Sequence, residues 1–156
     1  MIKNGISLLC LLGCLLALDA SKVLSEVSFP QSEIVIISRS GDHKFIVDIA
    51  TTPSQRQLGL MFRQHMRPNH GMLFNFGEAK LISMWMKNTL ISLDMLFVDS
   101  DGTILQIEQK TTPLSLDKIS GTLPAMSVIE LNAGVTAKLG IFEGDQVIHD
   151  IFLEQE

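Results

Sequence analysis

After residue 26 the chain is a series of short runs rich in β-branched and aromatic residues, each closed by a turn signal. Residues 33–37 and 45–49 are two such runs, and Ser40-Gly41-Asp42 lies between them. Side chains in a strand alternate between its two faces, so every second residue from Phe45 shares one face. This spacing predicts a β-hairpin and restricts the chain to a fold built mainly from short antiparallel strands.

Similar runs follow along the rest of the chain. The run Asp99-Ser100-Asp101-Gly102 predicts a turn between two paired strands. The pair Gly144-Asp145 predicts a turn before the last strand of the chain. Residues 111–126 contain two prolines and are expected to form a long loop, and residues 133–139 a short turn or helix. The further expected strands are 72–76, 83–89, 93–98, 103–109, 128–132 and 147–153. Since closure removes exposed sheet edges, we expect an α+β, mostly β fold with a small closed or partly open β-barrel-like sheet.

One main α-helix is predicted to pack on this sheet. Thr52 can cap it, Pro53 suits its first turn, and Gln55 completes a capping box. Apolar residues then recur at helical spacing as far as His65, which predicts a stripe facing the sheet. The stripe consists of Leu58, Met61, Phe62 and His65.

The N-terminus predicts export. Lys3 precedes an uncharged apolar run over residues 5–18, which Asp19 ends before the length of about 20 residues that a membrane span needs. We therefore expect residues 1–25 to be a cleavable signal peptide, with cleavage after Ala20 or Ser25, and residues 26–156 to be a single globular domain. The expected location is the periplasm, with no membrane span after processing. The alternatives are a retained membrane anchor and a lipoprotein attached through Cys14.

Composition excludes several classes of site. Both cysteines, Cys10 and Cys14, lie in the expected leader, so the mature domain has no disulfide, thiolate nucleophile or zinc–cysteine site. The four histidines do not have metal-ligand spacing, and no phosphate loop or dinucleotide fingerprint occurs, so no metal and no cofactor are expected. A net charge of −5 makes nucleic acid an unsuitable partner.

A cluster of polar residues is the candidate ligand site. In a strand over 83–89, Trp85, Lys87 and Thr89 would share a face beside a helix that carries two arginines. Tryptophan offers a stacking plane, and the cations offer charge-assisted donors, which suits a small anionic or sugar-like ligand. The candidate set is Arg56, Arg63, Trp85, Lys87, Asn88, Thr89 and Asp94. The alternative is a structural ion-pair network of Arg56 or Arg63 with Asp94 or Glu130.

The same region carries a family resemblance. The run Met84-Trp85-Met86-Lys87-Asn88-Thr89, with Gly59-Leu60-Met61-Phe62-Arg63 before it and Glu130-Leu131-Asn132-Ala133-Gly134 after it, resembles the domain of unknown function 192 (DUF 192) family of small, often exported prokaryotic proteins. One departure is Ser92, where the family pattern has proline. The resemblance implies a fold of mixed strands with one helix and implies no reaction.

Three functions remain open from the sequence. The first is a non-catalytic small-ligand-binding or accessory module of the cell envelope. The second is a hydrolase or lyase that acts on a small anionic or sugar substrate and uses Asp94 or Glu130 as its base. The third is a structural protein-interaction domain. A deep pocket that holds a carboxyl group with a raised pKa would favour the enzyme, and a flat apolar patch the third function.

Overall fold

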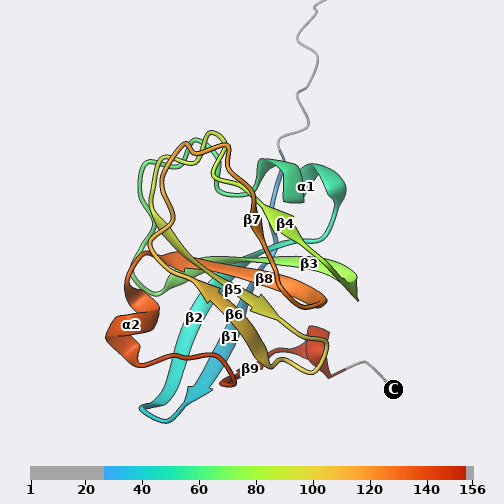
Figure 1. Cartoon of the computed structure of the whole chain (residues 1–156), viewed down its shortest axis with the longest axis vertical. Helices are drawn as coiled ribbons and strands as arrows, with labels where there is room; N and C mark the ends of the chain where they lie inside the picture. Colours follow the sequence, from blue (N-terminus) through green and yellow to red (C-terminus); the bar gives the residue numbers. More distant parts are fainter. Residues whose placement is uncertain (1–26, 154–156) are drawn as a thin grey trace, which may run out of the picture.

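The computed structural model describes residues 27–153, so the expected signal peptide and Cys14 lie outside the described residues. A curled sheet of seven strands forms the body of the domain (Figure 1). Its strands are β1 (Gln31–Ser38), β2 (Gly41–Ala50), β3 (His70–Lys80), β5 (Leu93–Val98), β6 (Ile104–Glu108), β8 (Ala125–Asn132) and β9 (Gln146–Ile148). A separate small sheet pairs β4 (Ser83–Met84) with β7 (Ile119–Ser120).

The seven strands follow the order β6-β5-β8-β3-β2-β1-β9, and all neighbours are antiparallel except β2 and β3. The two ends of the sheet approach each other where Thr103 bridges Gln146. There the Val147 amide donates to the Gly102 carbonyl at 2.8 Å. Gly102 is required at this contact, because a Cβ would lie 2.3 Å from the Val147 carbonyl oxygen. The expected mostly β, partly open barrel-like fold is confirmed as a half-barrel.

Both faces of the sheet are covered. One core cluster includes Ile34, Phe45 and Ile129, and a second, on the other face, includes Met72 and Phe97. A strand buried on both faces reads as a continuous apolar run rather than an alternating one. Strand β8 is of this kind, since seven of its eight residues are buried. An acidic side chain on β8 is therefore placed among apolar neighbours.

The start of α1 (Pro53–Leu58) confirms the predicted capping. The Thr52 hydroxyl accepts a hydrogen bond from the Gln55 amide, and the Gln55 side chain accepts one from the Thr52 amide. The expected continuation to His65 is wrong. The helix ends at Gly59, whose φ of 48° suits glycine and whose position lies directly over the Phe74 ring. No residue of α1 is buried, so the predicted apolar stripe does not form.

The expected strand over 83–89 is also wrong beyond Met84. The Thr89 amide donates to the Met86 carbonyl at 3.0 Å, which closes a turn. Met86 is fully buried in the second core cluster, and its burial sets the path of the chain in place of strand alternation. Trp85 and Lys87 are exposed, whereas Thr89 is buried, so the three do not form one row.

The C-terminal part agrees with expectation in part. Residues 133–139 contain α2 (Val135–Leu139), and Gly144 has a φ of 90°, with the Asp145 carboxylate accepting from the Phe142 amide at 2.8 Å. The expected last strand is shorter than predicted, because β9 gives way to the 3-10 helix η1 (Asp150–Phe152). Within residues 27–153, no helix has the length and apolar character needed to cross a membrane.

Candidate ligand pocket

A pocket of about 210 Å³ lies between the end of α1, strands β3 and β4, and the turn that follows β4. Its volume is below the usual range of about 300–1,000 Å³ for drug-sized ligands, which restricts it to small molecules. Four of the residues singled out from the sequence line it: Arg56, Trp85, Thr89 and Glu130. The other lining residues include Gly59, Met61, Phe74, Phe76 and Met84.

Glu130 is the buried acidic group of the pocket. It lies on β8 opposite Met72 of β3 and Met95 of β5, so its side chain shares the apolar face of the sheet with both methionines. Only 4% of the residue is exposed. Burial raises the pKa of Glu130 from 4.5 to about 8, and no charge or hydrogen bond in residues 27–153 offsets this effect. Near neutral pH the carboxyl group is therefore mostly protonated and can donate a hydrogen bond to whatever enters the pocket.

Arg56 supplies the cation of the pocket. Its Nη1 donates to the Asn75 carbonyl oxygen at 3.0 Å and to the Thr51 carbonyl, and its guanidinium carbon lies 5.1 Å from the centre of the Phe76 ring. These contacts hold the guanidinium at one place between α1 and β3. Since a guanidinium has five N–H donors and only Nη1 is engaged within residues 27–153, donors remain for an anion.

Trp85 and Thr89 complete the polar part of the pocket. Trp85 is 46% exposed, and the Lys87 ammonium nitrogen lies 5.1 Å from its ring centre, on the surface. Thr89 is 6% exposed, and its hydroxyl makes a long contact of 3.4 Å with the Lys87 carbonyl oxygen. A stacking plane and a weakly engaged hydroxyl thus border the same cavity as Glu130.

Lys87 and Asn88 do not line the pocket. Asn88 has a φ of 56°, and its carbonyl oxygen accepts a hydrogen bond from the Phe62 amide at 2.8 Å. Its side-chain nitrogen contacts the Met61 sulfur at 3.8 Å. Asn88 therefore acts in the turn, because asparagine tolerates the left-handed conformation that the turn needs.

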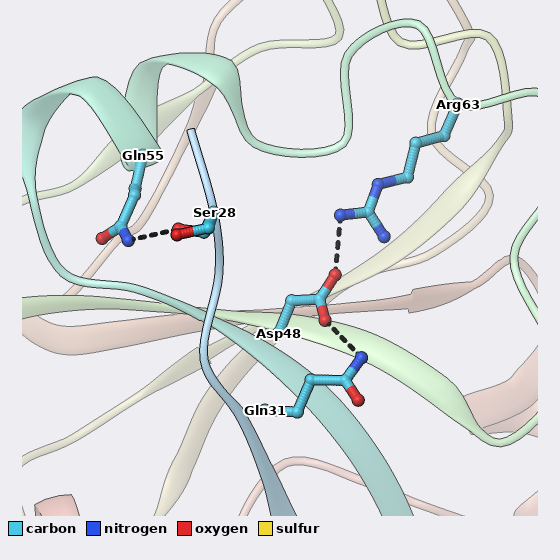
Figure 2. A network of polar contacts seen from close by, with 5 residues as sticks. All are labelled: Ser28, Gln31, Asp48, Gln55 and Arg63. Carbon is cyan, nitrogen blue, oxygen red and sulfur yellow. Dashed lines mark hydrogen bonds and ion pairs between the residues drawn. The ribbon is translucent and has the colours of Figure 1, made fainter. Parts of the chain in front are cut away.

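Arg63 lies in a different network, shown in Figure 2. Its Nη2 is 2.6 Å from Asp48 Oδ2, and Asp48 Oδ1 accepts a hydrogen bond from Gln31 at 2.8 Å. The Gln55 side chain donates to the Ser28 carbonyl oxygen at 2.8 Å beside it. This network ties the entry segment to β2 and to the start of α1. The ion-pair partner of Arg63 is Asp48, not Asp94 or Glu130.

Asp94 lies away from the pocket, on the other face of the sheet. Its residue is fully buried, and its carboxylate accepts hydrogen bonds from the Lys110, Gly134 and Thr136 amides and from the Thr136 hydroxyl, at 2.7–3.0 Å. Four donors satisfy a carboxylate and leave it no free position for a ligand. Asp94 therefore fixes the start of α2 to β5, and we leave it out of the proposed site.

The sequence reading missed the apolar walls of the pocket and the role of Asp48. Phe74 and Phe76 lie on one strand and line the pocket together with Gly59, the residue that ends α1 and lies against the Phe74 ring. The sequence does contain a signal that Glu130 is buried, because it is the one acidic residue in the otherwise apolar run Val128–Leu131. Among residues 27–153, no group of three or more histidine, aspartate or glutamate side chains could hold a metal ion.

The half-barrel and the pocket define a class of small, mostly β domain in which an acidic residue of a central strand faces a cavity beside a short helix. The chain belongs to the DUF192 family, described as "Uncharacterized ACR", whose model matches residues 35–149. Among curated proteins, no significant match to the chain is found.

Two crystal structures have the same fold. One is a protein of Sinorhizobium meliloti 1021, described as a "putative transcription regulator", with 47% identity and a TM-score of 0.77 over 79% of this chain and 96% of that one. The other is a protein of unknown function from Novosphingobium aromaticivorans DSM 12444, with 32% identity and a TM-score of 0.75 over 76% of this chain and 85% of that one. Neither description states a ligand or a reaction.

Proposed function

We propose that the protein is a non-catalytic binding module for a small anionic or sugar-like ligand, held in the pocket of Arg56, Trp85, Thr89 and Glu130. The observation that supports this proposal is the convergence of these four side chains on one cavity of about 210 Å³. They come from α1, from the turn after β4 and from β8, segments that are far apart in the sequence. A buried acidic side chain in an ordinary protein core has a hydrogen-bond partner, whereas Glu130 has none within residues 27–153 and borders an opening instead.

Each side chain has a distinct part in the proposed binding. Arg56 pairs with an anionic group, since guanidinium donors match the geometry of a carboxylate or phosphate. The protonated Glu130 carboxyl group donates a hydrogen bond to a hydroxyl or carbonyl oxygen of the ligand. The Thr89 hydroxyl, on a shorter side chain, donates a second one. The Trp85 ring gives an apolar plane for the face of a sugar ring. A sugar acid would use all four contacts at once.

Thermal unfolding with added ligands tests the proposal. The probes are glucuronate, glucose and acetate, which present both kinds of group, hydroxyls alone and a carboxylate alone. A binder at about 100 times its Kd stabilises the fold by about 2.7 kcal/mol, which raises Tm by several degrees. We expect the largest shift with glucuronate, and its loss in Arg56→Ala and Glu130→Gln but not in Lys44→Ala, a surface control distant from the pocket. Equal shifts in all four proteins, or shifts with none of the probes, would contradict a binding role for the pocket.

A second candidate function is a hydrolase or lyase that uses Glu130 for proton transfer. The observation that favours it is the pKa of Glu130, raised to about 8 by burial, because an acid–base group is most effective when its pKa lies near the working pH. In this function Glu130 protonates a leaving group, or accepts a proton from the substrate above its pKa. Asp94 takes no part, since its oxygens are engaged. Product release from a glucuronide, lost in Glu130→Gln and kept in Lys44→Ala, would favour the enzyme over the binding module.

We also propose that the domain acts outside the cytoplasm. The support is the sequence of residues 1–25, a basic start followed by an apolar run too short to span a bilayer. N-terminal sequencing of the protein from the envelope fraction should find a first residue between Ser21 and Glu26. A chain that starts at Met1, or at a lipidated Cys14, would contradict release as a soluble periplasmic protein.

A further inference from the structure

Three loops meet at the α1 end of the domain (Figure 1). Each of them carries at least one large, exposed apolar side chain. They span residues 61–69, 85–92 and 111–118. Backbone hydrogen bonds connect the three loops. The Phe62 amide donates to the Asn88 carbonyl oxygen at 2.8 Å. The Leu114 amide donates to the Thr89 carbonyl oxygen at 3.0 Å, and the Met86 amide donates to the Ser115 carbonyl oxygen at 3.2 Å. The exposed residues of this loop surface are Phe62 (64%), Trp85 (46%), Leu90 (44%), Leu114 (55%) and Leu116 (69%). Large exposed apolar side chains on loops that are hydrogen-bonded to one another indicate a candidate interaction site.

The backbone of the loop surface is held in unfavourable conformations. Phe62 and Leu114 have φ values of 66° and 63°, and both carry bulky side chains. Such residues rarely adopt positive φ, and strain of this type persists where the surrounding structure enforces it, often at functional sites. Here the strained residues are among the most exposed apolar ones, so their side chains are held outward and not packed into the core.

The charge of the loop surface is opposite to that of the rest of the chain. The three loops contain four basic residues, Arg63, Arg67, Lys87 and Lys118, against one acidic residue, Asp117, whereas the whole sequence has 12 basic and 17 acidic residues. Arg63 is neutralised by Asp48, which leaves three cations beside the apolar side chains. Lys87 lies over the Trp85 ring, a pairing of cation and aromatic group suited to a membrane–water interface.

We infer that the loop surface docks on an anionic lipid bilayer, with Phe62, Leu90, Leu114 and Leu116 inserted at the headgroup level and Lys87 and Lys118 against anionic headgroups. Exposed apolar tips flanked by cations are what such a surface recognises. This inference is independent of the proposed ligand, because these four apolar residues do not line the pocket.

Other occupants fit the loop surface less well. A second copy bound through the same face would bring the lysines of the two copies together, which like charges oppose. Nucleic acid would gain three cations but would have to cover apolar side chains that contribute nothing to phosphate binding.

Co-sedimentation with vesicles tests the inference. It uses residues 26–156, since the part of this chain that matches the related Sinorhizobium protein covers 96% of that crystallised chain. We expect the protein to sediment with vesicles of phosphatidylcholine and phosphatidylglycerol, more weakly with phosphatidylcholine alone, and less at high salt. Lys87→Ala should lower the binding to anionic vesicles roughly fivefold, the usual effect of one basic residue at a membrane surface.

Phe62→Asn and Leu114→Asn separate binding from folding. Asparagine tolerates positive φ, so both variants should unfold at the same or a higher temperature than the wild type. Each should bind vesicles roughly tenfold more weakly, because one inserted apolar side chain is lost. The matched control is Phe142→Asn, because Phe142 is 62% exposed at a different place and its loss should leave binding unchanged.

Three results would overturn the inference: no sedimentation of the wild type with anionic vesicles, equal loss of binding in Phe142→Asn, or unchanged binding in both loop variants. A concentration-dependent dimer that Phe62→Asn dissociates would assign the surface to a second copy instead. Retention of a DNA duplex through Lys87 and Lys118, without vesicle binding, would assign it to nucleic acid.

Discussion

The carboxyl groups of Asp94 and Glu130 lie on opposite faces of the sheet, although the two residues are diagonal neighbours across the β5–β8 pair. Asp94 is paired with Leu131, and Met95 with Glu130, so a shift of one residue separates the two acids. Asp94 accepts four hydrogen bonds, whereas Glu130 has no partner in the part of the chain that the structure describes. One acid is thus part of the scaffold and the other faces a cavity, and their substitution should have different consequences.

Asp94→Asn should lower the free energy of unfolding by about 3 kcal/mol. The amide nitrogen would face either the Thr136 donors or those of Lys110 and Gly134, which leaves buried N–H groups without acceptors. Urea unfolding measures the loss. Asp42→Asn, at the exposed start of β2, is the control and should change stability by less than about 0.5 kcal/mol. Equal stability of the two variants would show that Asp94 does not hold α2 in place.

The pKa of Glu130 predicts a specific pH dependence. Because folding raises this pKa from 4.5 to about 8, the folded state keeps a proton that the unfolded state has lost between these two values. The contribution of Glu130 to stability is therefore fully present below pH 4.5 and is lost as pH rises towards 8, at about 1.4 kcal/mol per pH unit.

Glu130→Gln should remove this dependence. Between pH 5 and 8, the free energy of unfolding of the variant should rise relative to that of the wild type by about 1.4 kcal/mol per pH unit. Urea unfolding across that pH range measures this difference. Glu108→Gln, exposed at the end of β6, should keep the wild-type slope. Parallel profiles for the wild type and Glu130→Gln would mean that Glu130 ionises normally in the folded protein.

Arg56→Ala should destabilise the domain more than Lys87→Ala. The first removes hydrogen bonds to the Thr51 and Asn75 carbonyls and the contact with Phe76, at a cost of about 1–3 kcal/mol. The second removes an exposed ammonium from above Trp85, at a cost below about 1 kcal/mol. Chemical unfolding of both variants decides the order. A larger loss for Lys87→Ala would place Lys87 in the scaffold.

The ion pair of Arg63 and Asp48 should show measurable coupling. A double-mutant cycle with Arg63→Ala and Asp48→Ala should give a coupling free energy of about 1–3 kcal/mol. The reason is that the Asp48 side chain is only 11% exposed, so water screens its charge poorly. The pair Lys44–Glu33, whose side chains are 68% and 48% exposed, should give below about 0.5 kcal/mol and weaken with salt. Equal coupling in the two cycles would show that burial adds nothing to the Arg63 pair.

The sequence predicted those elements whose causes are local. The hairpin of β1 and β2 and the start of α1 depend on alternation, on Ser40-Gly41 and on the Thr52 cap, all within a few residues. The end of α1 and the turn at Thr89 depend on distant packing, through Phe74 below Gly59 and the buried Met86. Helical or strand periodicity cannot show such contacts, and Gly59 was the one local signal of an early helix end.

The candidate site was predicted by residue type and not by geometry. Arg56, Trp85 and Thr89 lie on the pocket, but Arg63 and Asp94 serve other parts of the fold, because strand register decides which face a side chain reaches. Pairing β8 between β3 and β5 requires segments far apart in the chain. From the sequence, Glu130 was only an alternative catalytic base. The strand register is needed to place its carboxyl group on the face of the sheet that borders the pocket.

During synthesis, β3 leaves the ribosome well before one of the two strands with which it pairs. Its parallel neighbour β2 precedes it, but its other neighbour β8 begins only at Ala125, after 44 intervening residues. Until β8 has emerged, β3 has one open hydrogen-bonding edge and apolar side chains on both faces, a template for pairing with other chains. Incomplete or stalled chains that end before Ala125 should therefore need a chaperone to stay monomeric, and the full-length chain should acquire its fold late.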